Sequence, residues 1–199
     1  MDRNRRLRCE IFDPDPFNSL MAARLQMSGA IEMMTIEKKI EAAFSHRNVP
    51  DVCVTLGETL TPEIGDALQF QHRRWTDISW RDWDSYPDAF FSLNPNAFQY
   101  YLPSLLVGVL QHEHQNFVAL HSLVGVLDRS PEPAFWDTFL TSRFLGLYVC
   151  EIEVIQEWFV ILAERVTFFS DETILRCIET LELIRQAAGR VGTPCPPKR

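Results

Sequence analysis

The segment at residues 90–106 constrains the fold more than any other, because it joins two helix signals to a dense group of aromatic side chains. Asn94 can accept hydrogen bonds from the free amides of a first helical turn, and Pro95 has the fixed φ that a first helical residue tolerates. The sequence therefore predicts a helix that begins at Asn94-Pro95. Pro103 lacks a backbone donor and disfavours helical geometry at Leu102, so we expect this helix to kink or restart there.

Apolar residues recur at helical spacing along most of the remaining chain. The pattern predicts further helices over residues 35–47, 61–74, 106–124, 170–188 and 135–166, the last being a segment that Gly146 can interrupt. One alternation typical of a strand, at residues 52–56, is short and has no partner elsewhere in the chain. We therefore expect an all-α protein, a single compact bundle of five to seven helices with at most a minor strand near residues 52–56.

Residues 1–33 differ in composition from the rest, with four arginines near the start and two Asp-Pro steps. We expect an N-terminal appendage here, either flexible or absent from a native chain that starts at Met34. Residues 34–192 are expected to form one helical domain, and residues 193–199 a tail.

The charge balance limits the classes of partner. A net charge of −8 opposes general binding to nucleic-acid phosphates and to anionic lipid, because both need a positive field. Charged residues interrupt every apolar run before the roughly 20 residues that a bilayer crossing needs. The five cysteines show neither a Cys-x-x-Cys pair nor zinc-ligand spacing, so we expect reduced thiols and a cytoplasmic location.

Local motifs give no support for a catalytic centre. His112 and His114 are two residues apart and fall on different sides of a helix, so they cannot easily meet one metal ion. Neither a phosphate-binding loop, nor a dinucleotide fingerprint, nor a Gly-x-Ser-x-Gly elbow occurs. We expect no metal, no cofactor and, on balance, no enzymatic activity, although a site assembled from distant residues would leave no local motif.

One candidate binding surface combines tryptophans with charges of both signs, which is typical of protein-recognition sites. Its residues are Arg73, Arg74, Trp80, Asp82, Trp83 and Asp84. The alternative is structural: the tryptophans fill a groove between helices while the arginines pair with the aspartates. For Trp80 and Trp83 both interpretations stay open.

A second candidate is a small-molecule pocket lined by aromatic side chains with a polar group at its base. Its residues are Tyr100, Tyr101, Glu113, His114, Phe117, Arg143 and Trp158. Glu113 falls within an apolar stripe, where a carboxylate needs a partner or a raised pKa, and Arg143 is the candidate partner. The same aromatics also fit a plain hydrophobic core.

The motif Ser-Leu-Asn-Pro-Asn-Ala-Phe-Gln-Tyr-Tyr-Leu-Pro at residues 92–103 resembles that of a widespread bacterial family known only as a domain of unknown function. The similarity extends more loosely over residues 36–110 and to an Arg143-Phe144 pair followed by an apolar helix. Residues 148–151 depart from the capped helix start expected there. The resemblance implies a fold and a bacterial origin, and it transfers no catalytic residue.

These observations favour a non-enzymatic, acidic, cytoplasmic protein that binds another protein. The example we favour is an immunity or antitoxin-type inhibitor of a basic toxin, because electrostatic steering favours a partner of opposite charge. The alternative is a small-molecule-binding protein or enzyme that uses the aromatic pocket with Glu113 or His114. A homo-oligomeric structural module is a third hypothesis.

Overall fold

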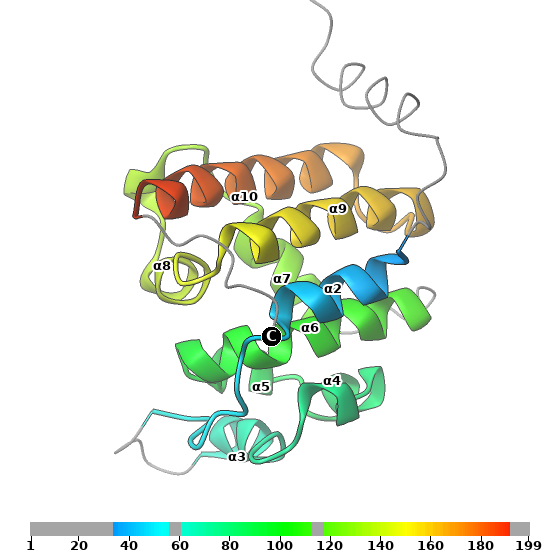
Figure 1. The fold of residues 1–199 in the computed structure, drawn as a ribbon, viewed down its shortest axis with the longest axis vertical. Helices are drawn as coiled ribbons and strands as arrows, with labels where there is room; N and C mark the ends of the chain where they lie inside the picture. The colour runs from blue at the N-terminus through cyan, green and yellow to red at the C-terminus, as the bar shows by residue number, and fades with distance from the viewer. Residues whose placement is uncertain (1–33, 56–60, 113–117, 192–199) are drawn as a thin grey trace, which may run out of the picture. The chain divides into compact units, whose positions relative to one another are not determined.

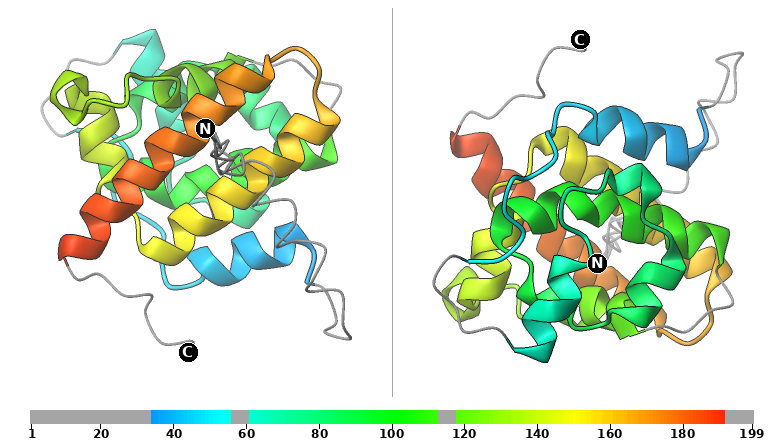
Figure 2. Two further views of the ribbon diagram at one scale, coloured as in Figure 1. Left: turned by 90° about the horizontal axis from the view of Figure 1, so that it is seen from above. Right: turned by 90° about the horizontal axis from the view of Figure 1, so that it is seen from below.

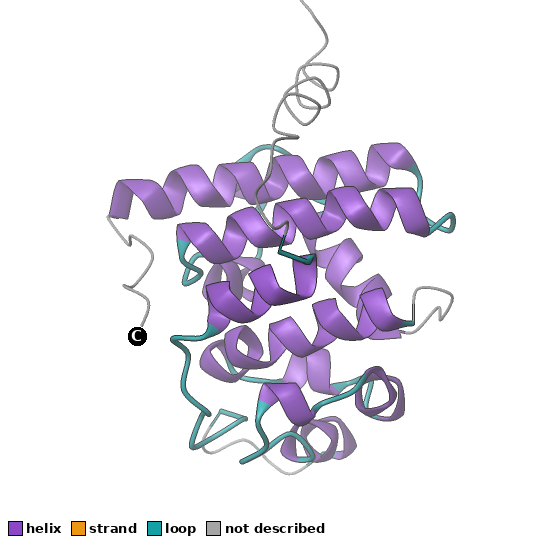
Figure 3. Ribbon diagram, turned by 45° about the vertical axis from the view of Figure 1, so that its right-hand side comes forward, coloured by secondary structure: helices purple, strands orange, loops and turns teal. Residues whose placement is uncertain are grey.

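The computed structural model describes residues 34–55, 61–112 and 118–191. These residues form helices joined by loops and contain no strand (Figure 3). The expectation of an all-α protein is therefore confirmed, and residues 52–55, the described part of the strand-like segment, form a loop. The appendage expected at residues 1–33 and the tail expected at residues 193–199 lie outside the described ranges.

Nine α-helices occur in the described residues, several of them shorter than the sequence pattern suggested. They are α2 (Ile36–Phe44), α3 (Pro62–Leu68), α4 (Trp80–Ser85), α5 (Ala89–Ser92), α6 (Pro95–Gln111), α7 (Val118–Leu127), α8 (Thr138–Phe144), α9 (Val149–Arg165) and α10 (Asp171–Val191). Two short 3₁₀ helices, η1 (Trp75–Asp77) and η2 (Pro133–Phe135), lie in the connections. Among the described helices, none combines the length and apolarity that a bilayer crossing requires.

Helix α6 lies at the centre of the packing, in contact with α2, α4, α7, α8, α9 and η1. Helices α9 and α10 run antiparallel side by side, and α2 packs against α9 (Figures 1 and 2). Helices α3 and α5 contact each other, and Figure 1 shows them with α4 on the side of α6 away from α10. Helices α3, α4 and α5 therefore lie on one side of α6, and α9 and α10 lie on the other.

The start of α6 agrees with the sequence prediction. The Asn94 side chain caps the helix by accepting from the Ala97 N–H at 3.0 Å, and its amide donates to the Val52 carbonyl at 2.8 Å. Helix α6 does not restart at Pro103 but runs through it. Every residue from Ala97 to Leu110 except one is buried, and this packing offsets the single backbone hydrogen bond that proline removes.

Two tryptophans from other helices are hydrogen-bonded to α6 in the core. Trp83 of α4 donates its indole N–H to the Ser104 hydroxyl at 3.0 Å, and Trp158 of α9 donates to the Leu106 carbonyl at 2.9 Å. Both side chains are almost fully buried. Since a buried indole N–H without a partner is costly, these bonds fix where α4 and α9 sit along α6.

Helix α3 ends earlier than expected, at Leu68 instead of near Arg74. His72 has a φ of 62°, a left-handed conformation that a helix cannot contain. The buried Tyr101 hydroxyl holds this turn by hydrogen bonding to the carbonyls of Phe70 and Arg73. The apolar periodicity could not reveal this end, because the tyrosine that fixes it lies in a different helix.

The long helix expected over residues 106–124 is also interrupted, because α6 ends at Gln111 and α7 begins at Val118. The backbone of His112 is no longer helical, with φ −138° and ψ 47°. Further along, residues 135–166 form η2, α8 and α9 with a break at residues 145–148. The Glu151 carboxylate caps the start of α9 by accepting from the Tyr148 N–H at 2.8 Å. This correction shows that the segment without an apparent cap does have one, in the form of a glutamate.

Two of the described cysteines, Cys53 and Cys177, are buried free thiols. Burial raises the pKa of both, that of Cys177 to about 12, so neither ionises readily. Cys150 is disulfide-bonded. The expectation of reduced thiols is therefore wrong at that position, where no Cys-x-x-Cys spacing indicates a bond.

Candidate functional site

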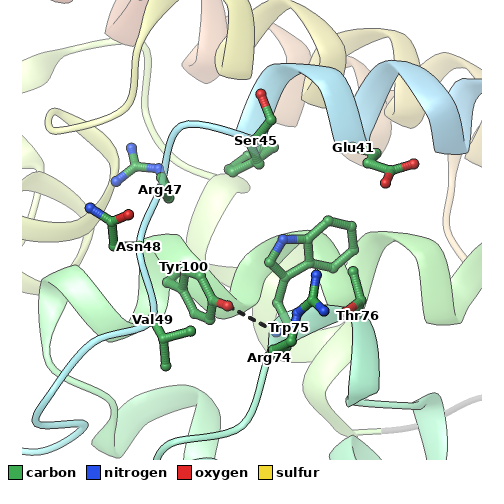
Figure 4. A pocket seen from close by; sticks show the side chains of 10 residues that line it. Glu41, Ser45, Arg47, Asn48, Val49, Arg74, Trp75, Thr76 and Tyr100 are labelled. Atoms are coloured by element: carbon green, nitrogen blue, oxygen red, sulfur yellow. Dashed lines mark hydrogen bonds between the residues drawn. The ribbon is translucent and has the colours of Figure 1, made fainter. Parts of the chain in front are cut away.

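A polar cleft of about 330 Å³ opens between the end of α2 and η1, and we call it the α2–η1 cleft. Figure 4 shows side chains from three parts of the chain that surround it. Its lining consists of Glu41, Phe44, Ser45, Arg47, Asn48, Val49, Arg74, Trp75, Thr76 and Tyr100. Helix α2 and its following loop supply one wall, η1 and Arg74 the other, and Tyr100 comes from α6.

A buried ion pair lies directly behind the cleft. The Glu151 side chain is 0% exposed, and the Arg47 guanidinium donates to it twice, from Nε and, at 2.6 Å, from Nη2. The same carboxylate accepts from the Tyr148 N–H at the start of α9. A buried carboxylate needs such compensation, because removing it from water without partners is very costly. The pair joins the loop after α2 to the start of α9.

Two further donors of Arg47 are also engaged. Nη1 donates to the Gln99 amide oxygen at 2.8 Å, and Nη2 donates to the Gly146 carbonyl at 3.2 Å. The Gln99 amide in turn donates to the Arg143 carbonyl at 2.7 Å. We call Arg47, Gln99, Gly146 and Glu151 the Glu151 network. It leaves the Arg47 guanidinium fixed in orientation and its charge balanced.

His46 lies beside this network with an incomplete set of partners. Its Nε2 is 3.4 Å from a Glu151 carboxylate oxygen and has no hydrogen-bond partner. Its ring is nearly perpendicular to the Tyr148 ring, and the two ring centres are 4.6 Å apart. Burial is the largest cause that lowers the pKa of His46, and Arg47 adds to it. Glu151 and a backbone hydrogen bond with Ala43 act in the opposite direction. The neutral imidazole is thus favoured in the folded protein.

This lowered pKa predicts a loss of stability in mild acid. The unfolded chain, whose His46 has the ordinary pKa of 6.5, takes up its proton before the folded protein does. Stability from this residue is present above pH 6.5 and decreases as the pH falls from 6.5 toward the lowered pKa of the folded state. Urea unfolding across this window should show a smaller decrease for His46→Gln than for the wild type. The exposed His121, changed to Gln, serves as the control, and equal slopes in His46→Gln and wild type would contradict the assignment.

The structure divides the first candidate surface into buried, paired and exposed residues. Trp83 is buried, and Asp82 accepts from Arg73 at 2.7 Å and from the Ser79 N–H at 2.7 Å, which caps α4. These three candidates therefore have structural contacts. The others are on the surface to different degrees: Trp80 is partly buried, while Arg74 and Asp84 are exposed. Of the six, Arg74 alone lines the cleft.

The second candidate set does not form one pocket in the described residues. Tyr100 lines the α2–η1 cleft, whereas Tyr101 of α6 and Trp158 of α9 are buried in the hydrophobic core. Arg143 donates to the Leu93 carbonyl at 2.6 Å and stacks on Phe139, with its guanidinium carbon 3.9 Å from the ring centre. The other three members, Glu113, His114 and Phe117, lie outside the described residues. In the ranges that are described, no three His, Cys, Asp or Glu side chains gather as a metal ion would need.

Sequence reasoning missed the residues of the Glu151 network, although one signal was available. Glu151 occupies the same face of α9 as Ile155, Trp158 and Leu162, at spacings of four, three and four residues. A carboxylate on an apolar face predicts burial with a partner. The identity of that partner was not readable, because Arg47 is 104 residues away.

The described helices and the cleft define an all-α protein in which one buried ion pair supports a polar surface site. The chain belongs to a family described as a family of unknown function, DUF6714, whose match spans residues 35–163. The resemblance to a family of unknown function is thereby confirmed. This span contains the motif at residues 92–103 and the whole Glu151 network, and it ends before α10. No curated protein and no solved structure matches the chain.

Proposed function

We propose that the chain is a non-enzymatic, cytoplasmic protein-binding module whose partner carries positive charge, of the immunity or antitoxin type. The observation that carries this proposal is the uncompensated negative charge on one side of α6. Asp84 at the end of α4 and Asp88 before α5 are exposed, and neither forms an ion pair with any described residue. They belong to a chain with a net charge of −8.

An aromatic side chain lies one helical turn before Asp84 on α4. Trp80 is partly exposed on α4, with the Arg81 guanidinium carbon 5.2 Å from its ring centre and the His112 ring at 4.7 Å. We call Trp80, Arg81, Asp84 and Asp88 the α4 surface. Tryptophan and arginine dominate the binding energy of many interfaces, and exposed carboxylates raise the rate of association with a basic partner. This combination supports protein recognition better than catalysis.

The proposal is tested with the full chain and the purified product of the neighbouring gene, the most direct candidate for an inhibited toxin. Calorimetry should detect a complex whose affinity decreases as salt is added, since exposed charges are screened. Asp84→Lys should weaken this complex about ten-fold or more, because it replaces attraction by repulsion at the interface.

The matched control is Glu179→Lys, which makes the same charge change on α10. Glu179 is exposed, and α10 packs on α7 and α9, on the side of α6 away from α4 (Figure 1). If steering depends on net charge alone, the two variants will weaken binding equally, and the α4 surface is not the interface. A failure of the two proteins to associate would contradict the proposal as a whole. Light scattering of the free chain in the same series tests the homo-oligomer hypothesis.

A further inference from the structure

The α2–η1 cleft contains one charge of each sign that nothing in the described structure neutralises. Arg47 also lines the cleft, but its charge is balanced by Glu151. Glu41 and Arg74 remain: both are exposed, and neither forms an ion pair or a side-chain hydrogen bond with a described residue. Because no ion pair joins them to each other, the lining is bipolar, with a carboxylate on α2 and a guanidinium beside η1.

Unused hydrogen-bond donors accompany the guanidinium. The Tyr100 side chain is only 5% exposed, and its hydroxyl accepts from the Trp75 backbone N–H at 3.3 Å. The hydrogen of that hydroxyl has no acceptor among the described residues, and neither has the Trp75 indole N–H. Figure 4 shows the Tyr100 hydroxyl and the Trp75 ring together in the cleft, with Arg74 beside them. A buried phenol with an unused proton favours an acceptor that enters from solvent.

The opposite wall favours a cation. Glu41 lies in the last turn of α2, whose C-terminal end carries a partial negative charge. The two walls therefore have opposite preferences: three donors, one of them charged, on the η1 side, and a carboxylate with a helix C-terminus on the α2 side. The Trp75 ring, on the η1 side, offers an apolar surface in the cleft.

We infer that the α2–η1 cleft binds a small zwitterion with an apolar group, the chemical class of the apolar amino acids. The ligand carboxylate lies against Arg74 and the Tyr100 hydroxyl, its ammonium group faces Glu41, and its apolar group packs on Trp75. The volume of about 330 Å³ is sufficient for a ligand of this size. This site is separate from the α4 surface and does not depend on the proposed protein partner.

Matched probes test the charge requirement. Calorimetry on the full chain compares L-phenylalanine with 3-phenylpropanoate, which lacks the ammonium group, and with 2-phenylethylamine, which lacks the carboxylate. L-Leucine and its two corresponding analogues repeat the comparison with an aliphatic side chain. At least one of the two amino acids should bind about ten-fold or more tightly than either of its analogues, since each missing group removes a charge-assisted contact.

Substitutions assign each wall. In Glu41→Gln the amino acid should bind no more tightly than the carboxylate analogue. In Arg74→Gln it should bind no more tightly than the amine. Tyr100→Phe should weaken the binding of the amino acid and of the carboxylate analogue, and it should leave the affinity for the amine unchanged. Glu37→Gln on α2 and Arg81→Gln on α4 are the controls outside the cleft. Glu41 and Arg74 are exposed, so these variants should fold, which circular dichroism verifies.

Three results would overturn the inference. The first is that neither amino acid binds at millimolar concentration. The second is that the carboxylate analogue binds as tightly as the amino acid, which would define a simple anion site. The third is that the control variants weaken binding as much as Glu41→Gln and Arg74→Gln do.

Discussion

Replacing Glu151 by alanine should lower the free energy of unfolding by about 3–5 kcal/mol, because it leaves the buried Arg47 guanidinium without its counter-charge. The Tyr148 N–H at the start of α9 also loses its acceptor. Arg47→Ala should have a similar cost, since the carboxylate is then the unpaired buried charge. Urea unfolding followed by circular dichroism measures both.

An exposed ion pair between the same two helices provides the control. Lys39 of α2 and Glu157 of α9 are 2.7 Å apart, with side chains 42% and 40% exposed. Glu157→Ala should cost only about 0–1 kcal/mol, because water solvates the lysine that remains. The double variant Arg47→Met with Glu151→Leu should be much less destabilised than the sum of the single changes, since it leaves no unpaired charge. If Glu151→Ala costs no more than Glu157→Ala, the buried pair is not the link between α2 and α9.

Gly146→Ala is expected to lower the free energy of unfolding by about 2–3 kcal/mol, because it displaces two partly buried hydrogen bonds, one of them to a charged group. A Cβ atom at position 146 would lie 2.5 Å from the Gln99 amide nitrogen. That amide cannot move freely, since it donates to the Arg143 carbonyl and its oxygen accepts from Arg47. Chemical denaturation measures the loss.

A double-variant cycle tests whether the contact with Gln99 causes this loss of stability, or whether Gly146→Ala disturbs the start of α9 in another way. In a Gln99→Ala background, Gly146→Ala should cost little more, because the obstructing amide is absent. Gly125→Ala on α7 is the control, and it should raise the free energy of unfolding, because nothing lies within 4 Å of the added Cβ. That change should stabilise the exposed helix position by about 0.5–1 kcal/mol. An undiminished cost of Gly146→Ala in the Gln99→Ala background would show that the contact with Gln99 is not the cause.

The features that the sequence predicted well depend on residues close to each other along the chain. Asn94 caps a helix whose first residue follows it directly, and Thr35 and Thr61 cap α2 and α3 in the same way. Apolar spacing over four or five turns predicted α9 and α10 because one face of each is buried. Local chemistry is sufficient for these elements.

The features that were missed depend on residues that meet only after folding. Arg47 contacts Gln99 and Glu151 from 52 and 104 positions away. The end of α3 likewise depends on Tyr101 from α6. The sequence placed Arg74 and Tyr100 in two different candidate sites, and only the folded structure shows that both line the α2–η1 cleft. No periodicity carries this information, since it resides in the packing of separate helices.

The distance along the chain between Arg47 and Glu151 also affects how the protein is made. During synthesis α2 leaves the ribosome long before Glu151, whose carboxylate binds Arg47 in the loop after α2, because 104 positions separate the two residues. Helix α2 cannot reach its final place until most of α9 has emerged. We therefore expect the first helix of the domain to dock among the last, and nascent chains shorter than about 150 residues to leave its apolar face open to chaperones.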